Sequence, residues 1–321
     1  VGEVGEVGDV GEADARAQAR ADEGLLTVER GLVHETLGER WGALCGDQAR
    51  ASAWADRLRP AVQRAWEQGL HAPGALACLS ALLAAGRGEE LLSLLSLRTI
   101  ACWPERQFGV RALAAEGSVD AAIDYAGSSN PLGHHHGQAI ARLCESLLLA
   151  DGQRARAYRE YAFAANARQN CLQTFKALVV AYPEHAPSTI LADLISASPG
   201  QEGNWFATAR ALRFFELAVE IAARSPCDPR TLCRAASERL DVDPQYAIEL
   251  GLSALRWLIE GYGVEIGAAD VLEAYDIVMR AGVRLGDSPE LRGRLRAEVL
   301  RLCELPAPSA TWVRELLANE L

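Results

Sequence analysis

The chain is poor in the residues and segments that mark several classes of protein. Aromatic residues make up 6% of its 321 residues, and Lys176 is its only lysine. Its longest apolar runs fall short of the ~20 residues that span a bilayer, and no basic-then-apolar signal segment opens the sequence. We therefore expect a soluble protein with no membrane partner.

Motifs for disulfide, metal or catalytic chemistry are also missing. The eight cysteines show no CxxC spacing, and most lie in Leu- and Ala-rich helical patterns, where a thiol behaves as a small hydrophobic group. This usage predicts no disulfide framework and a reducing, cytoplasmic location. No Ser-His-Asp, HExxH or GxSxG arrangement is recognisable. We expect no catalytic residue, no metal and no cofactor, although a site assembled from distant segments stays open.

The charge disfavours nucleic acid as the main partner. The formal net charge is −11, whereas binding to a phosphate backbone depends on Lys and Arg displacing counterions. Almost every cation apart from the histidines is arginine, a bias typical of a GC-rich bacterial genome.

What the chain does contain is alanine and leucine, which favour helices because they lose little side-chain entropy there. Residues 1–24 differ, since they open with Val-Gly-Glu triplets that place glycine at every third position. Regular glycines and acids oppose helix formation and core packing. We predict a disordered acidic tail over residues 1–24 and a single domain over residues 25–321.

A repeat emerges within this domain. Apolar helical segments end at Gly86, Gly117 and Gly152, which are 31 and 35 residues apart, and glycine is the preferred residue just beyond a helix. Second helices follow with a small–apolar–charged–apolar–small pattern. This pattern occurs at residues 122–126, 157–162, 218–222 and 247–251. A period of about 34 residues predicts an all-α, right-handed superhelical array of antiparallel helix pairs, a tetratricopeptide-like α-solenoid.

Later helices are marked by proline after Ser or Asp, a pairing suited to the N-cap and first helical position. We expect helices to start at Asp228-Pro229, Asp243-Pro244, Ser288-Pro289 and Ser309. We also expect two long helices, Trp205–Ala223 and Ala268–Leu285.

The least repeat-like segment is Pro199–Phe206, where two glycines flank an acid and an amide before an aromatic pair. The helix that follows carries Arg210 and Arg213. A glycine-rich approach to a helix N-terminus can bind an anion. The alternative is a structural turn with Trp205 as a core anchor, and the sequence leaves both open.

Two other motifs have a structural and a functional interpretation. His134, His135 and His136 are consecutive, so they cannot all face one metal on a helix; a solvated helix start is favoured over a weak metal contact through His134. Cys227 and Cys233 flank Asp228-Pro229-Arg230-Thr231-Leu232. Capping by Asp228 or Thr231 is favoured there over a metal or redox site.

Seven segments between about residues 72 and 300 share a likeness: Cys102-Trp103-Pro104, Gly109–Leu113, Ala141–Glu145, Ala157–Tyr161, Ile190–Leu194, Pro199–Ala207 and Ser225–Pro229. They resemble a family of uncharacterised bacterial helical-repeat proteins. The family turn reads Glu-Gly-Lys-Trp-Phe, and an earlier helix ends in Lys-Tyr-Pro. Here Asn204 replaces the first lysine and Ala181 precedes Tyr182-Pro183, so any ligand contact by those lysines is lost. The resemblance implies a fold, and the family has no assigned activity to transfer.

These features favour a protein-interaction scaffold or adaptor, because a solenoid presents a concave surface made by the first helix of each pair. Its partner would be another protein or a peptide. Tyr, Trp and Arg dominate interface hot spots, so we expect Tyr158, Tyr161, Trp205, Arg210 and Arg213 near that surface.

The competing hypothesis is a ligand-binding protein or enzyme with its site around Glu202 and Asn204. It predicts a deep polar pocket beside Trp205.

Overall fold

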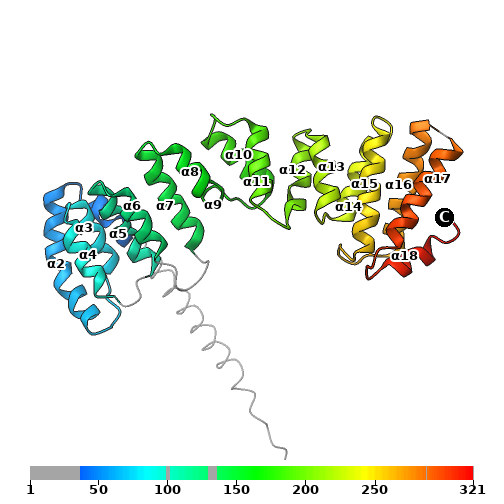
Figure 1. Cartoon of the computed structure of the whole chain (residues 1–321). Coiled ribbons are helices and arrows are strands. Elements are labelled where there is room, and N and C mark those ends of the chain that lie inside the picture. The colour runs from blue at the N-terminus through cyan, green and yellow to red at the C-terminus, as the bar shows by residue number, and fades with distance from the viewer. Residues whose placement is uncertain (1–36, 99–101, 129–135, 287, 321) are drawn as a thin grey trace, which may run out of the picture. The chain divides into compact units, whose positions relative to one another are not determined.

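The computed structural model describes residues 37–98, 102–128, 136–286 and 288–320 (Figure 1). All regular structure in these residues is helical, and none of them forms a strand, which confirms the all-α prediction. The acidic tail, His134 and His135 lie outside the described residues. None of the described helices combines the length and the apolar character needed to cross a bilayer.

The chain divides into two compact units, residues 1–165 and 166–321, called here the N-terminal and C-terminal units. Each is described by itself. Whether residues 25–321 behave as a single domain stays a prediction.

The N-terminal unit begins with helical residues 37–44. The helices that follow are α2 (Gln48–Glu67), α3 (Ala75–Ala84), α4 (Gly88–Ser96), α5 (Trp103–Ala115), α6 (Val119–Gly127), α7 (Gly137–Ala150), α8 (Arg154–Glu160) and α9 (Ala162–Ala165). Helices next to each other in the sequence pack together, as α2 does with α3 and α5 with α6. The core is built from these contacts between neighbouring helices.

The three predicted helix ends are confirmed. Gly86, Gly117 and Gly152 have φ of 71°, 82° and 76°, the left-handed region that glycine adopts without penalty. At each end the next residue's amide bonds back across the turn, for example from Gln153 N to Leu148 O at 2.8 Å. This double closure is the Schellman motif, which satisfies the last carbonyls of the helix.

Small residues in the second helices let neighbouring helices approach closely, as their pattern predicts. Ala122, Ala126 and Ala157 are fully buried. On the facing helix α5, a Cβ at Gly109 would lie 2.8 Å from the Tyr125 ring. The packing of α5 on α6 therefore needs glycine at position 109.

The C-terminal unit contains α10 (Cys171–Ala181), α11 (Pro187–Ser196), the 3₁₀ turn η2 (Glu202–Trp205), α12 (Phe206–Ala211), α13 (Phe215–Arg224), α14 (Pro229–Arg239), α15 (Pro244–Ile259), α16 (Ala268–Gly286), α17 (Pro289–Cys303) and α18 (Ala310–Leu316). The predicted starts of α14, α15, α17 and α18 are confirmed. Asp228, Asp243 and Ser288 cap their helices, each accepting a bond from the amide three residues later. Helix α16 matches the predicted Ala268–Leu285 to within one residue.

The long helix predicted over Trp205–Ala223 is wrong. It is interrupted between α12 and α13, where Arg213 has φ of 65°. Arg213 N bonds to Arg210 O at 2.9 Å and Phe214 N bonds to Ala209 O at 2.9 Å. Arg213 thus occupies the Schellman position that glycine fills at residues 86, 117 and 152. Neither glycine nor proline marks this break in the sequence.

Candidate functional site

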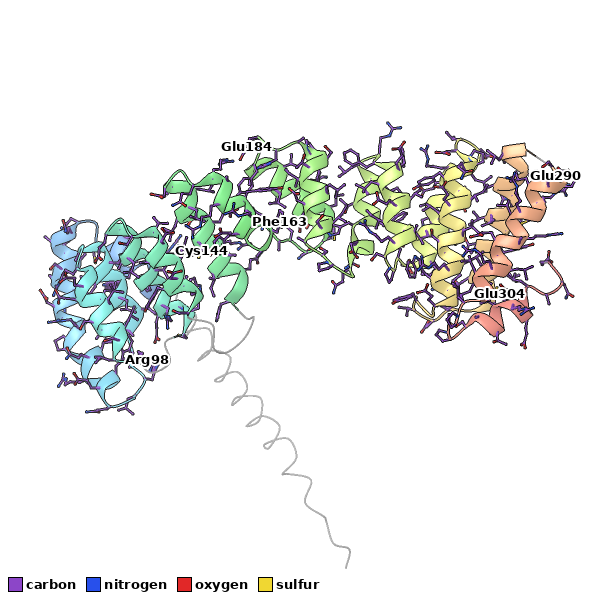
Figure 2. All side chains as sticks on the ribbon, in the orientation of Figure 1. Arg98, Cys144, Phe163, Glu184, Glu290 and Glu304 are labelled. Atoms are coloured by element: carbon purple, nitrogen blue, oxygen red, sulfur yellow. The ribbon has the colours of Figure 1, made fainter. Side chains whose placement is uncertain are left out.

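The two predicted tyrosines lie at the end of α8 in the N-terminal unit. Tyr158 is buried, with its ring edge-on to Phe163 at a centroid distance of 5.5 Å. Tyr161 is half-buried and shares a hydrogen bond with the thiol of Cys144. Burial raises the pKa of Cys144 to about 11, so this thiol is neutral at pH 7. Figure 2 labels Cys144 and Phe163 among the side chains of α7 to α9.

The predicted turn Pro199–Phe206 packs on the loop that joins α13 to α14. Gly203 N donates to Ser225 Oγ at 3.0 Å, and the Cys227 thiol lies 3.6 Å from Gly203 O. A Cβ at Gly203 would lie within 1.9 Å of Pro226 O. The glycine therefore serves a close contact between two loops.

Two of the side chains of this turn form hydrogen bonds with residues close by. Backbone amides of Glu202 and Gly200, helped by the Ser225 hydroxyl, hold the pKa of the Glu202 carboxyl below its usual range. Trp205 is only 6% exposed, and its Nε1 donates to Ser198 Oγ at 3.1 Å. Asn204 is exposed. The indole thus has the core-anchor position that the sequence left as one alternative.

The two predicted arginines lie on the next turn. Arg210 Nη1 lies 2.8 Å from Glu238 Oε2 of α14. Arg213 is exposed, and its guanidinium has no hydrogen bond or ion pair with the described residues. Because no hydrogen bond or ion pair with these residues holds it, this guanidinium is available to a partner.

A third arginine lies close to this turn, at the end of α14. Arg239 Cζ stands 3.9 Å from the centroid of Phe215 and 5.4 Å from that of Tyr246, both within cation–π range. The end of a helix favours cations, so α14 supports positive charge here. Arg210 and Arg213, together with Arg239 from the end of α14, are called the arginine turn below.

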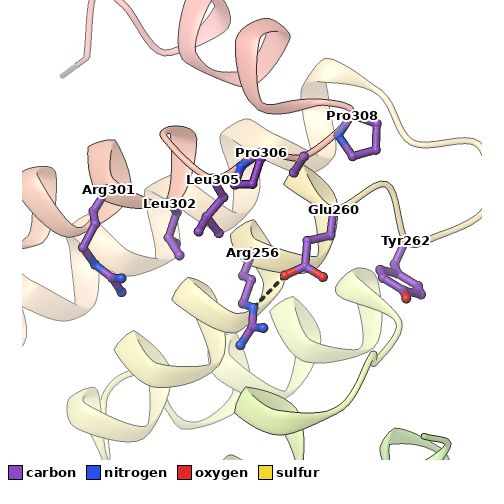
Figure 3. A pocket seen from close by; sticks show the side chains of 9 residues that line it. Arg256, Glu260, Tyr262, Arg301, Leu302, Leu305, Pro306 and Pro308 are labelled. Carbon is purple, nitrogen blue, oxygen red and sulfur yellow. Dashed lines mark hydrogen bonds and ion pairs between the residues drawn. The ribbon is translucent and has the colours of Figure 1, made fainter.

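A cavity beside the end of α15 in the C-terminal unit was not predicted (Figure 3). It has a volume of about 570 Å³, within the range typical of ligand sites. Its lining, called below the Tyr262 groove, comprises Arg256, Glu260, Tyr262, Arg301, Leu302, Leu305, Pro306, Ala307 and Pro308. In the close-up, Arg301 lies at one end and Tyr262 at the other.

The groove is shaped by two chain segments that meet beyond helix ends. At the end of α15, Gly261 has φ of 85° and Tyr262 N bonds to Trp257 O at 2.8 Å, another Schellman closure. The segment before α18 is tied to α15 by the bond from Ser309 N to Ile259 O at 3.1 Å. Two prolines, whose φ is fixed by their rings, stiffen that segment.

The groove's aromatic ring is well supported. Tyr262 is 44% exposed, and its ring stands edge-on to Trp257 at 5.4 Å. This is the apolar contact that commonly accompanies a Schellman motif. Trp257 is fixed in turn, since its Nε1 donates to Ala222 O at 2.7 Å. The tyrosine therefore presents a pre-ordered ring to solvent.

The two arginines of the groove differ in how firmly they are fixed. Arg256 Nε donates to Glu260 Oε1 at 2.8 Å, and its Nη1 donates to Ala223 O at 2.7 Å. Arg301, with 63% of its side chain exposed, pairs with Glu298 on the same helix. Arg256 is thus oriented by two acceptors, whereas Arg301 can turn toward a partner.

The sequence contained a partial signal for this groove. Tyr262 stands between Gly261 and Gly263, and Pro306 and Pro308 surround Ala307. An aromatic residue directly after a helix-ending glycine is the local sign of the Tyr262–Trp257 contact. The meeting of these two segments depends on tertiary packing.

The deep polar pocket expected beside Trp205 does not coincide with either described cavity. The second cavity, of about 10 Å³, is lined by residues around Arg230 and Asp270, and Trp205 lines neither. Within the described ranges, no three His, Cys, Asp or Glu side chains are grouped so that they could hold a metal. Comparison with protein-family models, curated proteins and solved structures found no match.

Proposed function

We propose that the protein is an interaction scaffold, a tetratricopeptide-like array of helix pairs that binds another protein in the bacterial cytoplasm. The observation that carries the proposal is the strained backbone of Arg213. This exposed arginine has no hydrogen bond or ion pair within the described part of the chain, yet its backbone lies in the left-handed region. A residue other than glycine costs roughly 1–2 kcal/mol there.

Equivalent turns in the same chain avoid this cost. At Gly86, Gly117 and Gly152, the same closure is made without strain. A turn that only joined two helices would be more stable with glycine. Backbone strain at an exposed position is typical of functional sites, and arginine is enriched at interface hot spots. Arg210, on the same turn, is half-exposed and adds a second cation.

The alternative ligand site at Glu202 and Asn204 has less support. The Glu202 carboxylate already accepts bonds from nearby amides, and Trp205 is buried rather than offered for stacking.

The proposal can be tested by affinity purification from the source organism, with the full chain as bait and quantitative mass spectrometry as the readout. Arg213→Ala and Arg213→Gly should each reduce recovery of the same partner by about tenfold, the effect of a hot-spot residue. Arg280→Ala is the matched control, because Arg280 is an exposed arginine of the same unit that pairs with Asp276 on its own helix. Unchanged recovery with both Arg213 variants would refute the role of this residue.

A further inference from the structure

We propose that the Tyr262 groove binds an extended, proline-rich segment of another protein, with an acidic side chain of that segment at Arg301. The inference rests on the proposed function in that the partner is a protein. It adds a docking site separate from the arginine turn.

The apolar part of the groove suits a proline-rich segment. Tyr262, Leu305 and Pro308 offer ring and aliphatic surfaces, and the Tyr262 ring is fixed by Trp257 before any partner arrives. Proline-rich segments dock on aromatic-lined grooves in a preformed polyproline II conformation, so little entropy is lost on binding. A rigid groove and a rigid ligand both lower the ordering cost of association.

The polar part of the groove offers mainly donors. The Tyr262 hydroxyl and Arg256 Nη2 make no hydrogen bond to the described residues, and Arg301 is largely exposed. A polyproline II segment has no internal hydrogen bonds, so its carbonyl oxygens can accept from such groups.

Other ways of binding a peptide fit this groove less well. The described residues form no strand whose edge could be extended by a peptide. A helical ligand needs an apolar groove for its i, i+3, i+4 and i+7 anchors, whereas Arg256, Glu260 and Arg301 interrupt the apolar lining. An extended segment is the form that this lining accommodates.

An exchangeable cation in the groove, Arg301, favours an acidic segment. Both arginines of the lining have a carboxylate partner, Glu260 for Arg256 and Glu298 for Arg301. The pair between Arg301 and Glu298 is an exposed i,i+3 contact, a type that contributes little. Arg301 can therefore exchange or share it for a fork-like contact with a partner carboxylate. Figure 3 places Arg301 opposite Tyr262, so the acid and the proline ring bind at different ends.

The test is fluorescence anisotropy with the full chain and labelled peptides Pro-Pro-X-Pro-Glu-Pro, in which X is varied over every amino acid. Three counterparts replace Glu with Gln, Glu with Lys, or every Pro with Ala. We expect at least one acidic proline peptide to bind with a Kd below about 100 μM, near −5.5 kcal/mol. Its Gln form should bind several-fold more weakly, and its Lys and Ala forms should not bind.

Variants assign the binding to the groove. Tyr262→Ala and Arg301→Gln should each weaken binding by about tenfold, as expected for anchors in a binding site. Tyr262→Phe keeps the ring and should lose less, while Arg280→Ala should bind as the wild type does. A helical circular dichroism spectrum establishes that each variant is folded.

Three outcomes would overturn the inference: no binding by any acidic proline peptide, equal binding by the Ala form, or equal binding by Tyr262→Ala and the wild type. A small carboxylate such as glutarate that competes as well as the peptide would also overturn it. The Arg213 variants separate this site from the arginine turn. If they retain the cellular partner but the peptides bind in the groove, the groove stands without the arginine turn.

Discussion

Replacing Arg213 with glycine should stabilise the C-terminal unit, which is unusual for the loss of a large side chain. The left-handed backbone of Arg213 costs roughly 1–2 kcal/mol, which glycine does not incur. Glycine also makes the unfolded chain more flexible, which lowers the free energy of unfolding by about 0.4–1 kcal/mol. Arg213 has no hydrogen bond, ion pair or ring contact with the described residues that would be lost. Taking the middle of each range, we expect a net gain of about 0.5–1 kcal/mol.

Urea unfolding followed by circular dichroism measures this gain as a rise in the midpoint at constant slope. Hydrogen exchange with mass spectrometry assigns the transition to residues 166–321. In a thermal scan, a unit of this size should melt roughly 1–4 °C higher. Arg213→Ala removes the guanidinium but keeps the left-handed backbone, so its stability should stay within about 0.5 kcal/mol of the wild type.

The mirror experiment places an arginine at the equivalent turn of the N-terminal unit. Gly152 has φ of 76°, and a Cβ there would meet nothing within 4 Å. Backbone strain is therefore the only expected cost of Gly152→Arg, and the loss should match the gain at Arg213, about 0.5–1 kcal/mol. If Arg213→Gly is neutral or destabilising while Gly152→Arg destabilises, the reasoning about Arg213 is wrong.

Three further predictions concern the C-terminal unit. Gly203→Ala should lower the free energy of unfolding in urea by about 3 kcal/mol or more, because its Cβ would overlap Pro226 O. Ser225→Ala should cost about 1–3 kcal/mol in the same assay, because the Gly203 amide loses its buried acceptor. Asp270 has a pKa lowered chiefly by its bonds to Arg230. Its stabilisation is therefore present above the unfolded pKa of about 3.9 and lost as pH falls through the folded value. Asp270→Asn should flatten the decline of stability between about pH 5 and pH 2.

Features set by local chemistry could be predicted from the sequence. The starts of α14, α15 and α17 follow from a capping side chain before proline, and each of those side chains accepts the expected amide. The helix ends at Gly86, Gly117 and Gly152 follow because glycine adopts positive φ freely. In both cases the determinants lie within four residues of one another.

Features set by contacts between distant residues could not be predicted. The break at Arg213 has no glycine or proline, and the helical pattern continues on both sides of it. Tyr262 and Pro308 become neighbours in one groove through the bond from Ser309 N to Ile259 O. The sequence around Trp205 is unusual, but only the packing places its indole against Ser198.

The two candidate surfaces share one structural position, the Schellman turn after a helix. Arg213 is the left-handed residue of one such turn, and Tyr262 directly follows the left-handed glycine of another. The turn satisfies its own carbonyls through backbone amides, so these hydrogen bonds do not depend on which side chains occupy the two positions. By contrast, the small residues on helix faces, such as Ala218 and Ala247, are fully buried in packing. A helical array can therefore change its binding residues at these turns while its core stays the same, and changes of partner should be concentrated there.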